Sequence, residues 1–152
     1  MSRVAHIQFH KERLIADFEF RLQCMAERAA RVPLHQMIPN DFYSAPSTEC
    51  RKLFVAGYYY GCITLCQSVA EGLSKVIADH APEIPPRKWF KPRIKALEAG
   101  GAIAPALARL FLDIHGDDRH TFHHLNRDVE QVDSKLELRA EECLNLLYQI
   151  ES

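Results

Sequence analysis

The segment from Ser47 to His80 constrains the fold most, because it is the most apolar part of the chain and has the pattern of a helix. Its apolar residues fall on nearly every helical face, which is typical of a helix at the centre of a bundle or in an interface. Ser47 or Thr48 is expected to cap its start. Gly57 and Gly61 lie one turn apart, which indicates close backbone approach by a helix of the same chain or of a second copy.

Helical patterns dominate the rest of the sequence as well, and no segment has a convincing strand pattern. Apolar residues three and four positions apart predict helices over about 10–31, 105–114 and 134–150, and the basic segment 87–95 supplies a fifth. A connector at 32–46, with three prolines, is expected to lie over the core. A chain of 152 residues, 47% of them hydrophobic, is therefore predicted to form one domain over 1–152, an all-α, up-and-down bundle of about five helices.

Charge and hydropathy restrict the functional classes. The formal net charge of −1 argues against a protein that coats nucleic acid through bulk charge, although it allows a local basic patch. The N-terminus has no apolar leader, and the most apolar run, 53–66, is too short to span a bilayer. We therefore expect a cytoplasmic protein without a membrane partner.

Cys62 and Cys66 would stack on one face of the central helix, since they are four residues apart. They can be read as half of a metal site or a redox pair. The favoured interpretation is that they are small core residues in a reducing compartment, because the chain has an odd number of cysteines and no Cys-x-x-Cys pair.

The basic segment 87–95 places five positive charges around two aromatic residues, Trp89 and Phe90. One interpretation is a surface that binds RNA phosphates and stacks bases, with Lys88, Lys91 and Arg93 as contacts. The other is an ordinary solvated helix face with both aromatic side chains turned inward.

Histidine and charge are most concentrated between positions 113 and 128, where four of the eight histidines fall. Three interpretations stand beside one another. The first is a polar turn that pairs histidines with aspartates. The second is a metal site, in which His120 and His124 lie four apart on one helix face and His115 or Asp117 completes the set. The third is acid–base catalysis on a phosphodiester without metal.

The third interpretation assigns one role to each kind of side chain. An imidazole that titrates near neutrality, His124, takes the proton from a ribose 2′-hydroxyl. The planar guanidinium of Arg119 holds the phosphate as charge builds in the transition state. His120 supplies a second proton-transfer group or a hydrogen bond.

The stretch Arg119-His120-Thr121-Phe122-His123-His124 resembles the signature of the HEPN domain family, which is an arginine, four to six residues, and a histidine. The resemblance covers about 48–152, and 1–47 is less diagnostic. The segment from Gly57 to Leu73 is similar to the long central helix of that family. That helix typically carries an acidic residue in an apolar setting, and Glu71 of this chain would match it. Pairing of Glu71 with Arg119 would orient the motif.

This resemblance implies a helical bundle that often forms a homodimer, with two motifs facing one cleft. Many members are metal-independent endoribonucleases, commonly toxins or defence and RNA-processing factors, whereas others are inactive dimerisation or partner-binding modules. The implied partners are RNA, a second copy, and an antitoxin or regulatory protein, with no cofactor.

Position 120 departs from the family, since His stands where Asn is usual. The expected site comprises catalytic Arg119, His120 and His124, supporting Glu71, Asp118 and His123, and RNA-binding Lys88, Lys91, Arg93 and Arg127.

Overall fold

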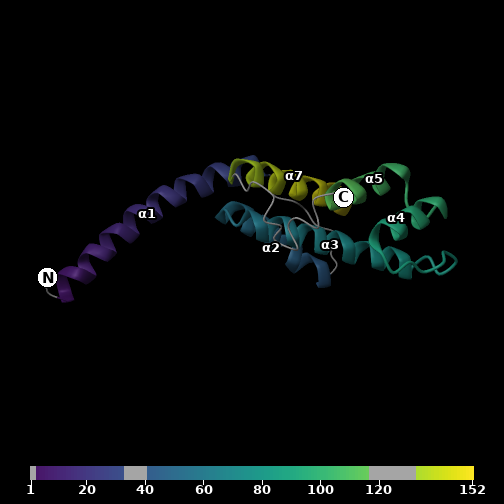
Figure 1. Cartoon of the computed structure of the whole chain (residues 1–152), viewed down its shortest axis with the longest axis horizontal. Helices are drawn as coiled ribbons and strands as arrows, with labels where there is room; N and C mark the ends of the chain where they lie inside the picture. Colours follow the sequence, from purple (N-terminus) through teal and green to yellow (C-terminus); the bar gives the residue numbers. More distant parts are fainter. Residues whose placement is uncertain (1–2, 33–40, 117–132) are drawn as a thin grey trace, which may run out of the picture. The chain divides into compact units, whose positions relative to one another are not determined.

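The computed structural model describes residues 3–32, 41–116 and 133–152 (Figure 1). These residues form six helices and no strand, which confirms the prediction of an all-α chain. The helices are α1 (Arg3–Arg31), α2 (Asp41–Ala56), α3 (Tyr59–Asp79), α4 (Phe90–Ala99), α5 (Pro105–His115) and α7 (Asp133–Glu151). The chain divides into two compact units, 1–33 and 34–152, so that α1 belongs to the first and the other helices to the second.

Helix α3 is the central element of the second unit. It contacts α2, α4, α5 and α7, and Figure 1 shows it alongside α2 and α7. Its inward side chains Cys62, Ile63, Cys66 and Ala70 are fully buried. Burial on several faces explains why this segment carries apolar residues around the whole helix. The prediction that it lies at the centre is confirmed.

The prediction of one continuous helix from 47 to 80 is wrong, because Gly57 divides it into α2 and α3. Gly57 has φ 83°, in the left-handed region that favours glycine. Its N–H donates to the carbonyl of Phe54, and the N–H of Tyr58 donates to the carbonyl of Leu53. These two bonds form the Schellman motif that ends many helices. Gly57 therefore terminates α2.

Close backbone approach occurs at Gly72 instead. A methyl group there would collide with the aromatic ring of Tyr43, so the absence of a side chain lets this ring pack on the backbone of α3. Gly61 has more room, since the nearest Leu53 methyl would be 3.5 Å away. Tyr43 belongs to the expected connector, and this part of it is helical: α2 begins at Asp41. Ser47 lies within α2 and does not cap a helix.

Helix α5 matches its predicted bounds closely. Pro105 occupies its first turn, and Gly116, with φ 52°, follows its last residue, His115. Proline suits the start of a helix because it has no N–H to leave unsatisfied, and glycine suits the end because it adopts positive φ. The chain thus leaves α5 at a defined point, immediately before the histidine-rich segment.

Within the described residues, no helix is both long enough and apolar enough to cross a membrane.

Candidate nucleic-acid interface

All three predicted catalytic residues, with several of the supporting ones, lie outside the described residues. The segment 117–132 holds Asp118, Arg119, His120, His123, His124 and Arg127. The structure does describe the end of α5, from which this segment begins, and the surfaces of α4 and α7 beside it. The candidate site is built from these surfaces.

Two polar side chains hold the carboxyl end of α5. Arg139 of α7 donates from Nη2 to the carbonyl oxygens of Asp113 at 3.1 Å and Ile114 at 3.4 Å. Gln67 of α3, which is buried, donates from Nε2 to the carbonyl oxygen of Ile114 at 3.3 Å. The last carbonyls of a helix have no partner within it, and a cation also interacts favourably with the negative end of the helix dipole. These contacts fix the point where the histidine-rich segment starts.

A stacked pair of rings also anchors the end of α5, in this case to α4. The ring of His115, the last residue of α5, stacks on the ring of Phe90 at the start of α4, with centroids 4.2 Å apart and planes 10° from parallel. Both side chains are buried, and Phe90 also contacts Phe111 edge to face. His115 is therefore part of the packing between α4 and α5. The metal-site interpretation that used His115 as a ligand receives no support from this geometry.

A hollow of about 500 Å³ opens beside Gly116, at the junction of α4, α5 and α7. Lys91 and Lys95 line it from α4, and both side chains are exposed. Acidic side chains line it too. Glu142 pairs with Nη1 of Arg139 at 2.7 Å, and Asp113 lies 4.0 Å from Nε of Arg109. The two lysines are one helical turn apart, so they present adjacent ammonium groups to an anion.

Trp89 directly precedes the first residue of α4. Its side chain is 69% exposed, and Nζ of Lys88 lies 5.1 Å from the centre of its ring. An exposed tryptophan next to lysines is the arrangement that stacks a base and contacts its phosphate. The alternative interpretation required both aromatic side chains to turn inward. Phe90 does so, but Trp89 does not.

Arg93 differs from the other cations of the basic segment, because its side chain is buried. Its guanidinium donates to the carbonyl oxygens of Arg87 at 3.3 Å and Lys88 at 3.0 Å, and to Oγ of Ser74 at 3.0 Å. These bonds tie the loop before α4 to α3. Arg93 thus holds the loop that carries Trp89, and we leave it out of the RNA-contacting set.

Glu71 lies on α3 and is partly buried. Its Oε1 lies 3.2 Å from Nζ of Lys75, one turn further along the helix. The predicted pairing with Arg119 involves a residue outside the described ranges and stays a prediction.

Three cysteines of α2 and α3 belong to the core. Cys50, Cys62 and Cys66 are fully buried, and the sulfur atoms of Cys62 and Cys66 are 4.0 Å apart. Burial, with hydrogen bonds from Cys50 and Cys62, raises the pKa of the Cys66 thiol well above its ordinary value. A neutral, buried thiol is a poor nucleophile and a poor metal ligand. This agrees with the interpretation of these residues as core packing.

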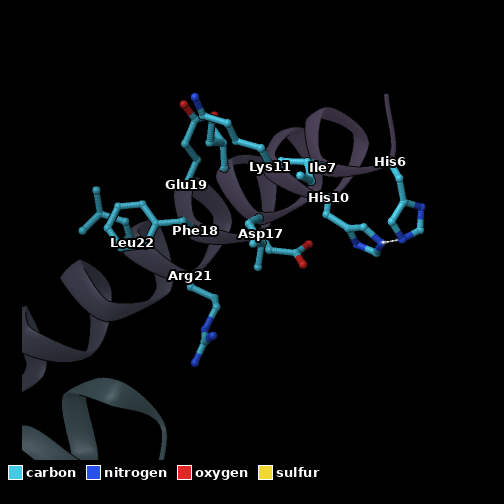
Figure 2. A pocket seen from close by; sticks show the side chains of 11 residues that line it. His6, Ile7, His10, Lys11, Asp17, Phe18, Glu19, Arg21 and Leu22 are labelled. Carbon is cyan, nitrogen blue, oxygen red and sulfur yellow. Dashed lines mark hydrogen bonds between the residues drawn. The ribbon is translucent and has the colours of Figure 1, made fainter. Parts of the chain in front are cut away.

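No cluster of three or more metal-ligating side chains occurs among the residues that the structure describes. One pair of imidazoles lies on α1, where Nε2 of His10 is 3.1 Å from Nε2 of His6 (Figure 2). Two imidazoles leave a transition-metal site incomplete, since such sites usually take three or four protein ligands.

The sequence did not identify Gln67 or Arg139 as site residues. For Gln67 the available signal was a long polar side chain in the most apolar helix, because such a residue needs a buried partner. Arg139 gave no comparable signal on the amphipathic α7. Comparison with protein-family models, curated proteins and solved structures finds no match to this chain.

Proposed function

We propose that this chain is a HEPN-like endoribonuclease that works without metal, with Arg119 and His124 as its catalytic residues. The observation that carries the proposal is the spacing of these two residues in a segment that begins at the anchored end of α5. Lys91 and Lys95, which line the hollow beside Gly116, support it as phosphate contacts, and the exposed Trp89 at the start of α4 supports it as a base contact.

The reaction would be an internal transesterification of RNA. His124 takes the proton of a ribose 2′-hydroxyl, and the 2′-oxygen attacks the adjacent phosphorus. The bond from phosphorus to the 5′-oxygen breaks, and that oxygen leaves with a proton as a 5′-hydroxyl. The other product is a 2′,3′-cyclic phosphate. Arg119 binds the non-bridging oxygens as their charge grows, and His120 orients a group or supplies the proton.

Anchoring of α5 gives this chemistry a positional basis. A catalytic pair acts efficiently only when its groups are held in the reacting geometry. Gln67, Arg139 and the stack of His115 on Phe90 connect α3, α4 and α7 to the residues that precede the motif. Arg119 follows Gly116 by three residues in the sequence, so the anchored end of α5 is the nearest described part of the chain to the motif.

Cleavage of a labelled single-stranded RNA in EDTA tests the proposal, beside the same RNA with 2′-O-methyl riboses. We expect cleavage of the first substrate only, a cyclic phosphate at the new end, and loss of cleavage in Arg119→Ala and His124→Ala. Arg109→Ala and His80→Ala, two exposed positions, are the matched controls and should cleave like the wild type. Activity that disappears with EDTA, or that survives in both motif variants, would contradict the proposal.

The RNA surface has its own test. Trp89→Ala should weaken binding of single-stranded RNA by about 5–150-fold, the value of one stacked base. Lys91→Gln should reduce the slope of log affinity against log salt by about 0.7, the contribution of one phosphate contact. Lys52→Gln, an exposed lysine of α2, should change neither quantity. Wild-type affinity in both Trp89→Ala and Lys91→Gln would remove this surface from the proposal.

The runner-up function is an inactive partner-binding module, in which the motif is only a hydrogen-bonded turn. It is favoured if no RNA is cleaved and if Arg119→Ala and His124→Ala keep their stability. A toxin role would in turn require that expression of the wild type arrests growth, and that Arg119→Ala relieves the arrest without lowering protein abundance.

A further inference from the structure

A second hollow, of about 460 Å³, lies between the end of α3, the loop before α4 and α4 itself. We call it the α3–α4 groove. All of its lining residues belong to the second unit, and Figure 1 shows α4 beside the end of α3. Pockets that hold small molecules usually measure roughly 300–1,000 Å³ and are mostly apolar. The apolar wall of this groove includes Pro82, Ile84, Pro85, Pro86, Ala96 and Leu97.

Bonds within the chain hold the wall of the groove in place. The N–H of Ile84 donates to the carbonyl oxygen of Ala81 at 3.0 Å. A methyl group at Gly100 would collide with Ile84, so this side chain packs directly on the end of α4. Arg93 ties the loop to α3 as described above. A ligand would therefore meet a surface that is already formed, which lowers the entropic cost of binding.

The side chain of Arg93 lines the groove although it is only 6% exposed. Its three hydrogen bonds all go to uncharged groups, the carbonyl oxygens of Arg87 and Lys88 and the hydroxyl of Ser74. A guanidinium has five N–H donors, so one N–H remains on each terminal nitrogen. No carboxylate of the described residues forms an ion pair with it. The segment around it, 87–95, contains only basic charged residues.

The charges of the groove leave one positive charge without a partner. Lys75 is paired with Glu71 at 3.2 Å. Asp79 and Arg87, both exposed, carry opposite charges. The charge that remains is that of Arg93, and a buried charge is costly unless an opposite charge accompanies it. The groove therefore favours a ligand with a single negative charge.

We propose that the α3–α4 groove binds a small organic acid that has one carboxylate on an apolar body, and that the carboxylate pairs with Arg93. The two N–H groups left on the guanidinium match the two oxygens of a carboxylate in number. The apolar body covers the prolines and Ile84. This site does not depend on the RNA proposal, because it uses neither Arg119 nor His124.

A phosphate monoester fits the groove less well than a carboxylate. It carries close to two negative charges at neutral pH and has three oxygens to satisfy. Pro82, Pro85 and Pro86, which supply much of the loop side of the groove, have no backbone N–H to donate. The groove thus offers few donors beyond those of Arg93.

The first experiment titrates the full chain with three acids, 2-naphthoate, indole-3-acetate and decanoate, by calorimetry and by amide chemical shifts. We expect at least one of them to bind with one site per chain and to shift amides of residues 75–97. The alcohol that corresponds to the acid, such as 2-naphthalenemethanol, should bind about 10–150-fold more weakly, since it lacks the charged hydrogen bonds. Inorganic phosphate serves as the competing anion.

The second experiment locates the ligand with variants. Ala96→Leu fills the groove and should weaken binding of the acid by about ten-fold or more. Ala99→Leu is the matched control, because Ala99 is exposed on the same helix and does not line the groove. Arg93→Lys keeps the charge but has fewer donors, so it should reduce the ratio between acid and alcohol affinities. A loosened loop alone would weaken both ligands and leave this ratio unchanged.

The proposal fails if none of the three acids binds, or if acid and alcohol bind equally well to the wild type. An unchanged ratio in Arg93→Lys would also contradict it. Equal effects of Ala96→Leu and Ala99→Leu, or loss of binding in Trp89→Ala, would place the acid outside the groove. Inorganic phosphate that binds more tightly than every acid would show that the ligand class is wrong.

Discussion

Arg139 of α7 donates a hydrogen bond of 3.1 Å to the backbone carbonyl oxygen of Asp113 in the last turn of α5. The same guanidinium reaches Ile114 and pairs with Glu142, so one side chain joins α7 to the end of a neighbouring helix. Its side chain is only 14% exposed, which limits the water available to replace it. Two consequences follow, one for stability and one for the proposed reaction.

Replacement of Arg139 by Leu should lower the free energy of unfolding by about 1–3 kcal/mol, because it removes the donor to the Asp113 carbonyl oxygen and one of the two donors to that of Ile114. In the proposed nuclease the same change should lower kcat more than it raises KM, since the motif loses its fixed starting point. Urea unfolding and steady-state cleavage measure the two effects.

Arg109→Leu is the control for Arg139→Leu, because Arg109 is an exposed arginine of α5 whose carboxylate partner is 4.0 Å away. An exposed pair of this kind contributes about 0–1 kcal/mol. Equal losses of unfolding free energy in the two variants would show that the hydrogen bonds of Arg139 to α5 stabilise the chain no more than an exposed ion pair does.

Arg93→Met should release the loop before α4. The variant keeps most of the buried volume but removes the donors to Arg87, Lys88 and Ser74. We expect faster amide exchange over residues 80–90 and a loss of about 1–3 kcal/mol in unfolding free energy. Lys95→Met, an exposed change on the same helix, should leave exchange in this loop unaltered. Wild-type exchange in Arg93→Met would contradict the structural role.

Gly57→Ala should destabilise the second unit by about 1–2 kcal/mol, because alanine is strained at φ 83°. Gly61→Ala is the matched change one turn later, where the new methyl meets Leu53 at an ordinary distance. It should leave stability unchanged or raise it by up to about 1 kcal/mol. Thermal or urea unfolding distinguishes the two glycines, and equal effects would argue against the helix break.

Local signals in the sequence were sufficient for some elements. Pro105 and Gly116 flank a short apolar stripe, and they gave α5 bounds within one residue of those observed. The central position of α3 also followed from its apolar residues, since a helix that is apolar on several faces must be covered on several sides. The break at Gly57 was missed because the apolar pattern continues across it. The periodicity of apolar residues carries no information on the backbone φ of one residue.

Other features depend on tertiary packing and could not be predicted. Arg93 is buried against two backbone carbonyls, which every residue possesses, and one serine hydroxyl, so no acidic side chain in the sequence indicates its burial. Gln67 and Arg139 reach the end of α5 from helices that lie far away in the sequence. The roles of Arg119 and His124 rest on the motif and stay predictions until the cleavage test.

Glu151 near the carboxyl end of α7 should make stability depend on pH. Its Oε2 accepts a hydrogen bond of 2.9 Å from Oγ of Ser47 in α2, and both side chains are buried. Burial raises the pKa of this carboxyl group above its ordinary value, and the bond from Ser47 opposes the shift only in part. The folded state therefore binds a proton more readily than the unfolded state. Its contribution to stability is complete below the unfolded pKa and is lost as pH rises through the higher folded value.

Glu151→Gln removes this titration while keeping a group that can accept the bond from Ser47. Relative to the wild type, the variant should gain stability as pH rises from about 4 toward neutrality, since the unfolded pKa of a glutamate is about 4.3. Urea midpoints measured across this range test the expectation. Glu49→Gln, at a half-exposed position paired with Lys52, should follow the wild-type profile. Parallel profiles for Glu151→Gln and wild type would mean that the carboxyl group ionises as easily in the folded chain as in the unfolded one.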